Sequence, residues 1–211
     1  MPSPKSNGLE DLSRRERRRL EVRGRILKAA AELFYRQGFQ DTTVVELAEH
    51  ADVAKRTLFN HFPTKQHVLR ELAMQVFHEL LLDVETARKT AASTRERIVT
   101  LFGRVDRLRS QTGPMAREMA FEFLHATLEA GLQRDEGDRF RVALEGIVQD
   151  GVAQGDVTQR HDPETLAATI SAVYFSLIMS WSQDEAFPVA RKAREAAGFL
   201  ADSIARRPDE G

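Results

Sequence analysis

The sequence of 211 residues contains no cysteine, a single tryptophan and no apolar run of about 20 residues. Without cysteine the chain forms no disulfide, zinc–thiolate site or iron–sulfur cluster, and cysteine catalysis is excluded. Without a long apolar run we predict no membrane span. The polar stretch 1–12 lacks the apolar core of a signal peptide. We therefore expect a soluble cytoplasmic protein whose size suits one large domain or two small ones.

Motifs typical of enzymes are also missing. The sequence has no glycine-rich phosphate loop, no nucleophile elbow and no HExxH zinc motif. Glu118 and Glu122 form an i, i+4 carboxylate pair, and Glu122 with His125 matches the ExxH motif of di-iron bundles, but no second copy of this motif exists. We predict that the protein is not an enzyme and uses neither a metal nor a cofactor. A di-iron bundle is the alternative that the carboxylate pair leaves open.

Charge is unevenly distributed along the chain, although the net charge is only −1. Residues 1–65 contain 13 Lys and Arg against 9 Asp and Glu, whereas the remainder contains 18 against 23. A basic head on an acidic body indicates a nucleic-acid partner. Chance asymmetry on a solvated helical surface is the alternative. The cluster from Arg14 to Arg19 belongs to this head, either as phosphate contacts or as a solvated helix end.

Helical spacing of apolar residues recurs throughout and predicts an all-α fold. Capping boxes mark two helix starts, Ser13 with Glu16 and Thr43 with Glu46. Residues 1–12 are expected to form a disordered arm. The predicted helices, about nine in number, cover residues 13–37, 43–51, 54–62, 65–89, 93–112, 114–132, 137–153, 162–183 and 188–206.

Two short helices joined by a tight turn behind a basic helix are typical of a helix-turn-helix. Apolar residues such as Leu47 and Leu58 can lock the two helices against the first helix. That packing leaves one polar face of the third helix free for phosphates and base edges in a major groove, formed by Lys55, Arg56, Phe59, Asn60 and His61. An ordinary three-helix bundle with a solvated basic face is the alternative.

Residues 14–69 resemble the DNA-binding domain of the TetR family of transcriptional regulators. The resemblance rests on ILKAAAELFYRQGF at 26–39, TTVVELAEHADV at 42–53 and KRTLFNHFPTK at 55–65. It implies a helix-turn-helix domain over 13–63 and a ligand-binding and dimerisation domain over 64–211. It also implies a homodimer that binds a palindromic operator in double-stranded DNA, in most cases a repressor released by a small-molecule effector. A helical ligand-binding or scaffold protein without DNA function is the alternative.

The resemblance also implies roles for individual residues. Contacts to the DNA backbone are expected from Thr43, Thr57, Phe59, His61 and Lys65. Base contacts are expected from Lys55, Arg56 and Asn60, and at most a thymine methyl contact from Val45. Three positions depart from the family pattern: Asp52 replaces a glycine of the turn, Ala54 replaces a Ser or Thr cap, and Arg56 replaces a frequent glycine.

The last two predicted helices are apolar over more than one face, which favours burial on two sides. We predict that they form the interface between two copies, through Ile170, Val173, Leu177, Trp181, Val189, Ala193, Ala197, Leu200 and Ile204. Completion of a core within one chain is the alternative. A ligand cavity is expected between the fourth and eighth helices, lined by Phe77, Leu81, Phe102, Met119, Phe123, His125, Tyr174, Phe175 and Met179. The same residues could instead be plain core.

Overall fold

The computed structural model describes residues 13–128 and 134–207, apart from the side chains of 114, 123, 125–128 and 134–138. Within these residues the chain is all-α, as predicted, with a lone bridge between Val157 and Ala205 and no strand. The predicted arm, 1–12, lies outside them. The elements are α1 (Arg14–Gln37), α2 (Val44–His50), α3 (Lys55–His61), α4 (Lys65–Thr90), α5 (Thr94–Thr112), the 3₁₀ turn η1 (Gly113–Met115), α6 (Ala116–Leu128), α7 (Arg134–Gln154), α8 (Pro163–Gln183) and α9 (Val189–Ile204).

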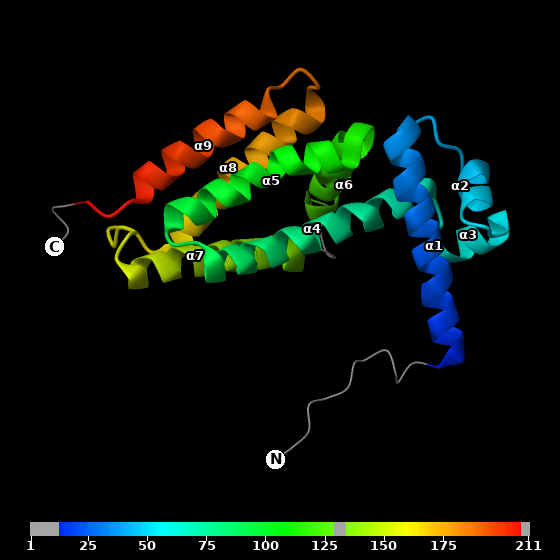
Figure 1. Ribbon diagram of the computed structural model, residues 1–211, viewed down its shortest axis with the longest axis horizontal. Coiled ribbons are helices and arrows are strands. Elements are labelled where there is room, and N and C mark those ends of the chain that lie inside the picture. The colour runs from blue at the N-terminus through cyan, green and yellow to red at the C-terminus, as the bar shows by residue number, and fades with distance from the viewer. Residues whose placement is uncertain (1–12, 129–133, 208–211) are drawn as a thin grey trace, which may run out of the picture.

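The helices form a small head and a larger body, joined by α4. Figure 1 shows α1, α2 and α3 at one end of the molecule, while α4 runs from the head along the body made by α5–α9. Each part has its own apolar core, and α4 contributes to both: Leu69 and Leu72 to the core of the head, Phe77 and Leu80 to that of the body. Met119 of α6 also packs into the core of the head. A displacement of α4 or α6 is therefore felt in both parts.

Side-chain caps account for several of the helix starts. Ser13 with Glu16 and Thr43 with Glu46 form reciprocal capping boxes, as predicted. Gly38, with φ +85°, ends α1 in a conformation that favours glycine. The predicted helix from residue 114 instead begins with the turn η1 and becomes α-helical at residue 116. Its predicted end at residue 132 lies outside the described residues.

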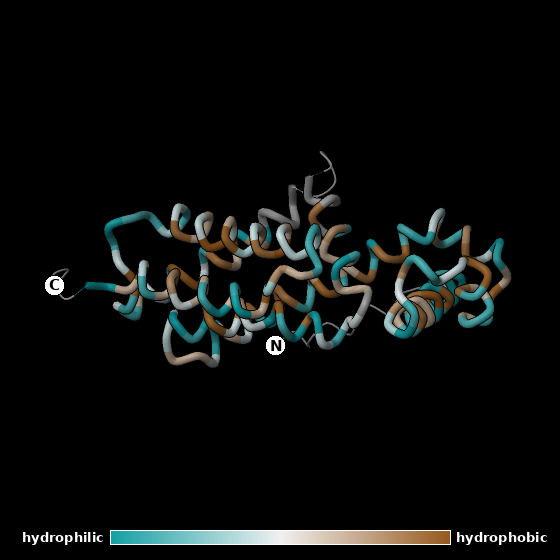
Figure 2. Tube along the Cα trace, turned by 90° about the horizontal axis from the view of Figure 1, so that it is seen from above, coloured by the Kyte–Doolittle hydropathy of each residue, from teal (hydrophilic) through white to brown (hydrophobic). Residues whose placement is uncertain are grey.

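The body is built from α5 on α9, α7 on α8, and α4 on both α6 and α7. In Figure 2 apolar residues recur along the helices of the body between polar ones. α8 is long and apolar enough by composition to cross a membrane, which the sequence analysis did not anticipate. Seven of its residues, Tyr174 and Trp181 among them, are nevertheless buried inside the chain. The core helix of a globular protein meets the same criterion, so this composition is weak support for a membrane span.

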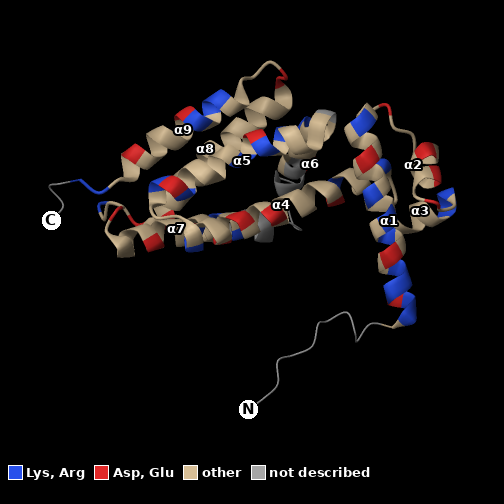
Figure 3. Cartoon of the chain, in the orientation of Figure 1, with Lys and Arg blue, Asp and Glu red and all other residues tan. Residues whose placement is uncertain are grey.

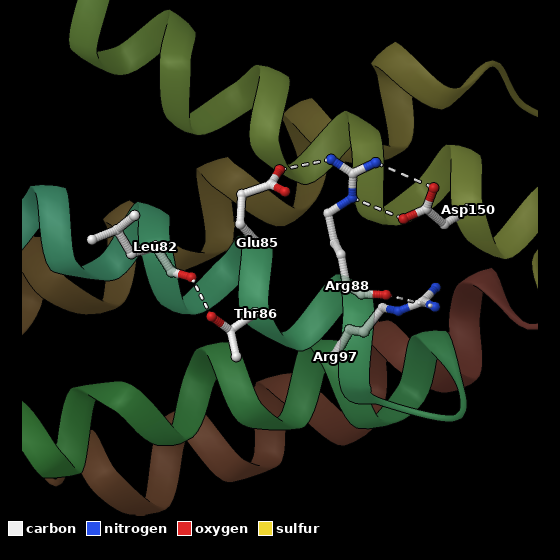
Figure 4. A network of polar contacts seen from close by, with 6 residues as sticks. All are labelled: Leu82, Glu85, Thr86, Arg88, Arg97 and Asp150. Carbon is white, nitrogen blue, oxygen red and sulfur yellow. Dashed lines mark hydrogen bonds and ion pairs between the residues drawn. The ribbon is translucent and has the colours of Figure 1, made fainter. Parts of the chain in front are cut away.

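An arginine fixes α4 to α7 (Figure 4). The Nε and Nη2 atoms of Arg88 donate to Asp150 at 2.8 and 3.2 Å, and Nη1 donates to Glu85 at 2.8 Å. The hydrogen bond to Asp150 raises the pKa of Arg88, and the same bond lowers the pKa of Asp150. A Cβ at position 146 would lie 2.5 Å from the Arg88 guanidinium carbon, so Gly146 leaves the room that this pair needs.

Candidate functional site

The outer face of α3 is polar and basic, because the apolar residues of the head face inward. Leu47 of α2 and Leu58 of α3 are fully buried. Lys55, Arg56 and Asn60 are exposed in a row on the outside of α3. Phe59 is also exposed, and the Nζ atom of Lys55 lies 5.9 Å from the centre of the Phe59 ring. The head thus presents hydrogen-bond donors and one aromatic ring on a single helix face.

The other predicted DNA contacts surround this face. Thr57 and His61 are half-buried, and Val45 and Thr43 are exposed on the neighbouring helix start. The Thr43 hydroxyl is engaged in the cap, where it accepts from the Glu46 N–H and donates to the Glu46 carboxylate. Burial, followed by the charges of Arg19 and Arg23, lowers the pKa of His61. A phosphate placed beside His61 would raise its pKa, because a negative charge favours the protonated imidazole.

The turn before α3 tolerates the aspartate that replaces glycine. Asp52 has φ +52°, the left-handed conformation that aspartate accepts more readily than most residues. The Nη1 atom of Arg25 donates to the Asp52 carbonyl at 3.3 Å and to its carboxylate at 3.4 Å. α1 therefore holds the turn that sets the direction of α3. Ala54 precedes α3 with extended backbone and no side-chain cap, as expected from the sequence.

A second group of basic residues lies on the first turns of α1. In Figure 3 the ribbon is coloured blue, for Lys and Arg, along the free end of α1 and on α3. All five arginines of this group are exposed: Arg14, Arg15, Arg17, Arg18 and Arg19. Both basic groups belong to the head, so its exposed surface is suited to a polyanion.

Lys65 makes contacts within the chain that the sequence did not predict. Its Nζ atom donates to the carbonyl oxygens of Phe39 at 2.5 Å, Thr42 at 2.7 Å and Gln40 at 3.3 Å. It also lies 4.3 Å from the centre of the Phe39 ring, and burial lowers its pKa. An ammonium group has three donors, and all three are used within the chain. Lys65 therefore joins the start of α4 to the loop between α1 and α2, and its contact with phosphate stays a prediction.

The body contains a narrow apolar cavity of about 50 Å³ between α4, α5, α6 and α8. Three of the residues predicted to line it do so: Phe77, Met119 and Tyr174. Burial raises the pKa of the Tyr174 phenol, which keeps it neutral at the cavity wall. Sequence reasoning missed Arg104, which lines the cavity and pairs with Asp83 and Glu79. Its position one turn beyond the buried Leu101 on α5 is the signal that could have identified it.

The remaining cavity predictions fall elsewhere. Phe102 is buried in the body core, where its ring lies 5.5 Å from that of Tyr174. Leu81, Phe175 and Met179 pack against the same core without lining the cavity. These four positions are corrected to core residues. The side chains of Phe123 and His125 lie outside the described residues.

Comparison with known proteins agrees with this geometry. Residues 26–72 match the sequence model of bacterial regulatory proteins of the TetR family. The repressor KstR of Rhodococcus jostii is 26% identical over 204 residues, which cover 96% of this chain and 92% of that protein. Residues 26–72, which form most of the head, therefore carry the TetR-family signature.

Solved structures of TetR-family regulators share the whole fold. A regulator from Pectobacterium atrosepticum aligns with a TM-score of 0.72 at 20% identity, covering 93% of this chain and 100% of the other. Thermus thermophilus FadR, solved with lauroyl-CoA, aligns with a TM-score of 0.67 at 24% identity, covering 90% and 99%. The likeness therefore extends through the body, beyond the head that the sequence signature marks.

Most of the residues predicted for the dimer interface are instead buried in the core of the single chain. Seven of them are buried within the single chain: Ile170, Trp181, Val189, Ala193, Ala197, Leu200 and Ile204. Five of these belong to α9, which packs closely on α5. These seven assignments are therefore corrected. Val173 and Leu177 remain half-buried on α8, and Phe199 of α9 is 70% exposed.

Proposed function

We propose that this chain is a homodimeric transcriptional repressor of the TetR family. It binds a palindromic operator in double-stranded DNA and is released when a small molecule enters the cavity of the body. The observation that carries this proposal is the exposed polar face of α3, held outward by a helix-turn-helix head that matches the family. KstR, which is similar to this chain, is named as a transcriptional repressor, and this supports repression rather than activation. A cytoplasmic location and a role without catalysis follow from this function.

Recognition of DNA is divided between α3 and α1. The Arg56 guanidinium can donate to O6 and N7 of guanine, and the Asn60 amide can pair with adenine in the major groove. Lys55 and Thr57, at the start of the same helix, and His61, at its end, are placed to contact bases or phosphates. The arginines at the free end of α1 neutralise further phosphates, each of which steepens the salt dependence of binding by about 0.9 in log-log slope.

Release depends on the narrowness of the apolar cavity. At about 50 Å³ it is far below the roughly 300–1,000 Å³ of typical ligand sites, so a ligand has to push its walls apart. Val76, Phe77 and Leu80 of α4 form one of those walls. Because α4 is also part of the head's core, its displacement reorients the head. To release the protein from its operator, the ligand must bind the state with α4 displaced more tightly than the undisplaced state, by a few kcal/mol.

The second copy is proposed to pack on the outward surface of α8 and α9. Ala172 and Ser176 are exposed on α8, and Phe199 is exposed on α9. Gly198 has no atom within 4 Å of a Cβ built on it, so the single chain leaves this surface open. Small residues beside one large apolar side chain allow two helix pairs to approach closely. This pairing sets the distance between the two α3 helices. That distance must match the spacing between successive major grooves on one face of the DNA.

The proposal is tested with duplexes taken from the region around the protein's own gene, compared with a random duplex by fluorescence anisotropy. We expect saturable binding to a palindrome with a clear preference over the random sequence. Arg56→Ala and Asn60→Ala are each expected to cost about 1–3 kcal/mol in binding free energy and to relax the preference at one base pair. Lys89→Ala, an exposed charge change at the end of α4, is the matched control.

Circular dichroism must show that the variants remain folded. If the folded wild-type protein binds the palindrome no better than random DNA, the repressor proposal is wrong. If Arg56→Ala and Asn60→Ala bind as tightly as the wild type, α3 is not the reading helix, and a helical ligand-binding protein becomes the better description.

A further inference from the structure

Arg23, near the middle of α1, contacts both the end of the reading helix α3 and α4. Its Nη1 atom donates to the carbonyl oxygen of His61, the last residue of α3, at 3.3 Å. Its Nη2 atom forms an ion pair of 2.9 Å with Oε2 of Glu71 on α4. Its guanidinium carbon lies 4.3 Å from the centre of the Phe62 ring, directly after α3. One side chain therefore joins three helices of the head.

The helix α3 depends on such contacts because it is short. It has seven residues, and helices of fewer than about 12 residues are marginal in isolation. Ala54 gives its start no side-chain cap, and the last carbonyl groups of a helix lack partners within the helix. Arg23 donates to one of these carbonyls, an interaction that stabilises a helix C-terminus. The end of α3 is thus held by a residue of α1.

The start of α3 is held from the same helix. Arg25, two residues further along α1, donates to the carbonyl and the carboxylate of Asp52 in the turn before α3. α1 packs on α2 and on α4, and α2 packs on α3. The contacts of Arg23 add a direct connection from α4 to the end of α3, which does not pass through α2.

The effect of this connection is on direction more than on stability. The side chains of Arg23 and Glu71 are 31% and 38% exposed, and ion pairs with this exposure contribute little to stability. We propose that Arg23 is a positioning residue for DNA reading, which fixes the direction of α3 relative to α4 without reading a base itself. The effect on DNA rests on the proposed repressor function, whereas the link between α4 and α3 does not.

The same link makes α3 responsive to the body. Glu71 belongs to α4, the helix whose displacement is proposed to follow ligand entry. When α4 moves, Glu71 moves away from the Arg23 guanidinium or pulls it along, and in either case the hold on the His61 carbonyl changes. The direction of α3 then depends on the position of α4.

The first test uses the sign of a charge effect. Glu71→Ala removes the partner of Arg23 and also one negative charge from the head. Charge alone predicts tighter binding to any DNA. The proposed link instead predicts that the preference for the palindrome over a random duplex falls about two- to fivefold, as expected for a partly exposed ion pair. Glu21→Ala, the same change at an exposed position of α1, is the matched control and should keep the preference of the wild type.

Changes at Arg23 itself separate positioning from a phosphate contact. Arg23→Met keeps an apolar side chain on Phe62 but has no donor, so we expect the preference to fall about tenfold. Arg23→Lys keeps the charge, but an ammonium lacks the planar fork that serves His61 and Glu71 together. It should restore binding to random DNA without restoring the preference. Adding Glu71→Ala to Arg23→Met should cause no further loss, because the two residues act through one contact.

Amide chemical shifts measured without DNA test the link independently of the repressor function. Glu71→Ala should shift the amide signals of residues 58–62, although Glu71 lies on another helix. Glu21→Ala should not shift these signals. In the Arg23→Met background the effect of Glu71→Ala on α3 should disappear, because the side chain that carries it is absent.

Unchanged signals of α3 in Glu71→Ala would overturn the link. Equal preferences of Glu71→Ala, Glu21→Ala and the wild type would overturn the positioning role, as would an Arg23→Lys protein with the full preference of the wild type. If circular dichroism shows that Arg23→Met is unfolded, Glu71→Ala and Arg23→Lys carry the test. A wild-type protein that selects no palindrome, but whose α3 signals respond to Glu71→Ala, would count against the repressor function alone.

Discussion

Lys65 stabilises the contact between α4 and the loop that precedes α2, through three carbonyl acceptors. We expect Lys65→Ala to lower the free energy of unfolding by about 1.5–3 kcal/mol, because charged donors make the stronger hydrogen bonds and the carbonyls would be left without a partner. Urea unfolding without DNA measures this, with Lys89→Ala as the exposed control. The salt slope of DNA binding tests the predicted phosphate contact separately, because the loss of one such contact lowers the slope by about 0.9. A Lys65→Ala protein as stable as the wild type would contradict the structural role.

The exposed and buried residues of the reading helix could be predicted from spacing, but the partner of Lys65 could not. Helical periodicity places Leu58 inside and Arg56 and Asn60 outside, and the structure agrees. The acceptors of Lys65 lie 23 to 26 residues earlier in the chain and approach it only through the packing of α1 on α4. A lysine at a helix N-terminus therefore looked like an anion contact, although it also serves the fold.

At the scale of elements, α3 lacks the side-chain N-cap that α1, α2, α4, α5 and α8 have. Ala54 has φ −65° and ψ 143°, an N-cap conformation without a side-chain acceptor. We expect Ala54→Ser to raise the free energy of unfolding by about 0.5–2 kcal/mol, because serine can accept from a free N–H of the first turn. Thr43→Ala should lower it by a similar amount, since it removes an existing cap. Urea unfolding compares the two. If Ala54→Ser is no more stable than the wild type although Thr43→Ala is weakened, the missing cap is not what limits α3.

Helix positions could be predicted well because caps and glycines mark their ends locally. What covers each helix could not, because an apolar stripe shows that a face is buried but not by which partner. Val189, Ala193 and Ala197 form such a stripe on α9, and α5 of the same chain covers it. The carboxylate pair on α6 was visible in the sequence as well. Its place beside Gln66 and Arg70, at the junction of head and body, depends on the tertiary fold.

At the scale of the whole molecule, the proposed dimer depends on a surface that the single chain leaves open. Phe199 is 70% exposed, so Phe199→Glu leaves the chain's own core intact. In a dimer the same charge would be buried against the partner without a counter-charge, which is strongly unfavourable. We therefore expect Phe199→Glu to be folded and monomeric, with the 23.8 kDa mass of one chain in light scattering. Binding to a palindrome should weaken to the level of a single half-site, because the second head is no longer tethered.

Val142→Glu provides the control for this change, since Val142 is 57% exposed on α7, away from the proposed interface. It should keep the mass and operator affinity of the wild type. A Phe199→Glu protein that retains twice the mass of one chain would place the interface elsewhere. If that protein became monomeric yet bound the palindrome as tightly as before, each head would act alone. The coupling of ligand to operator through the spacing of two heads would then have no basis, because spacing matters only where both heads engage one duplex.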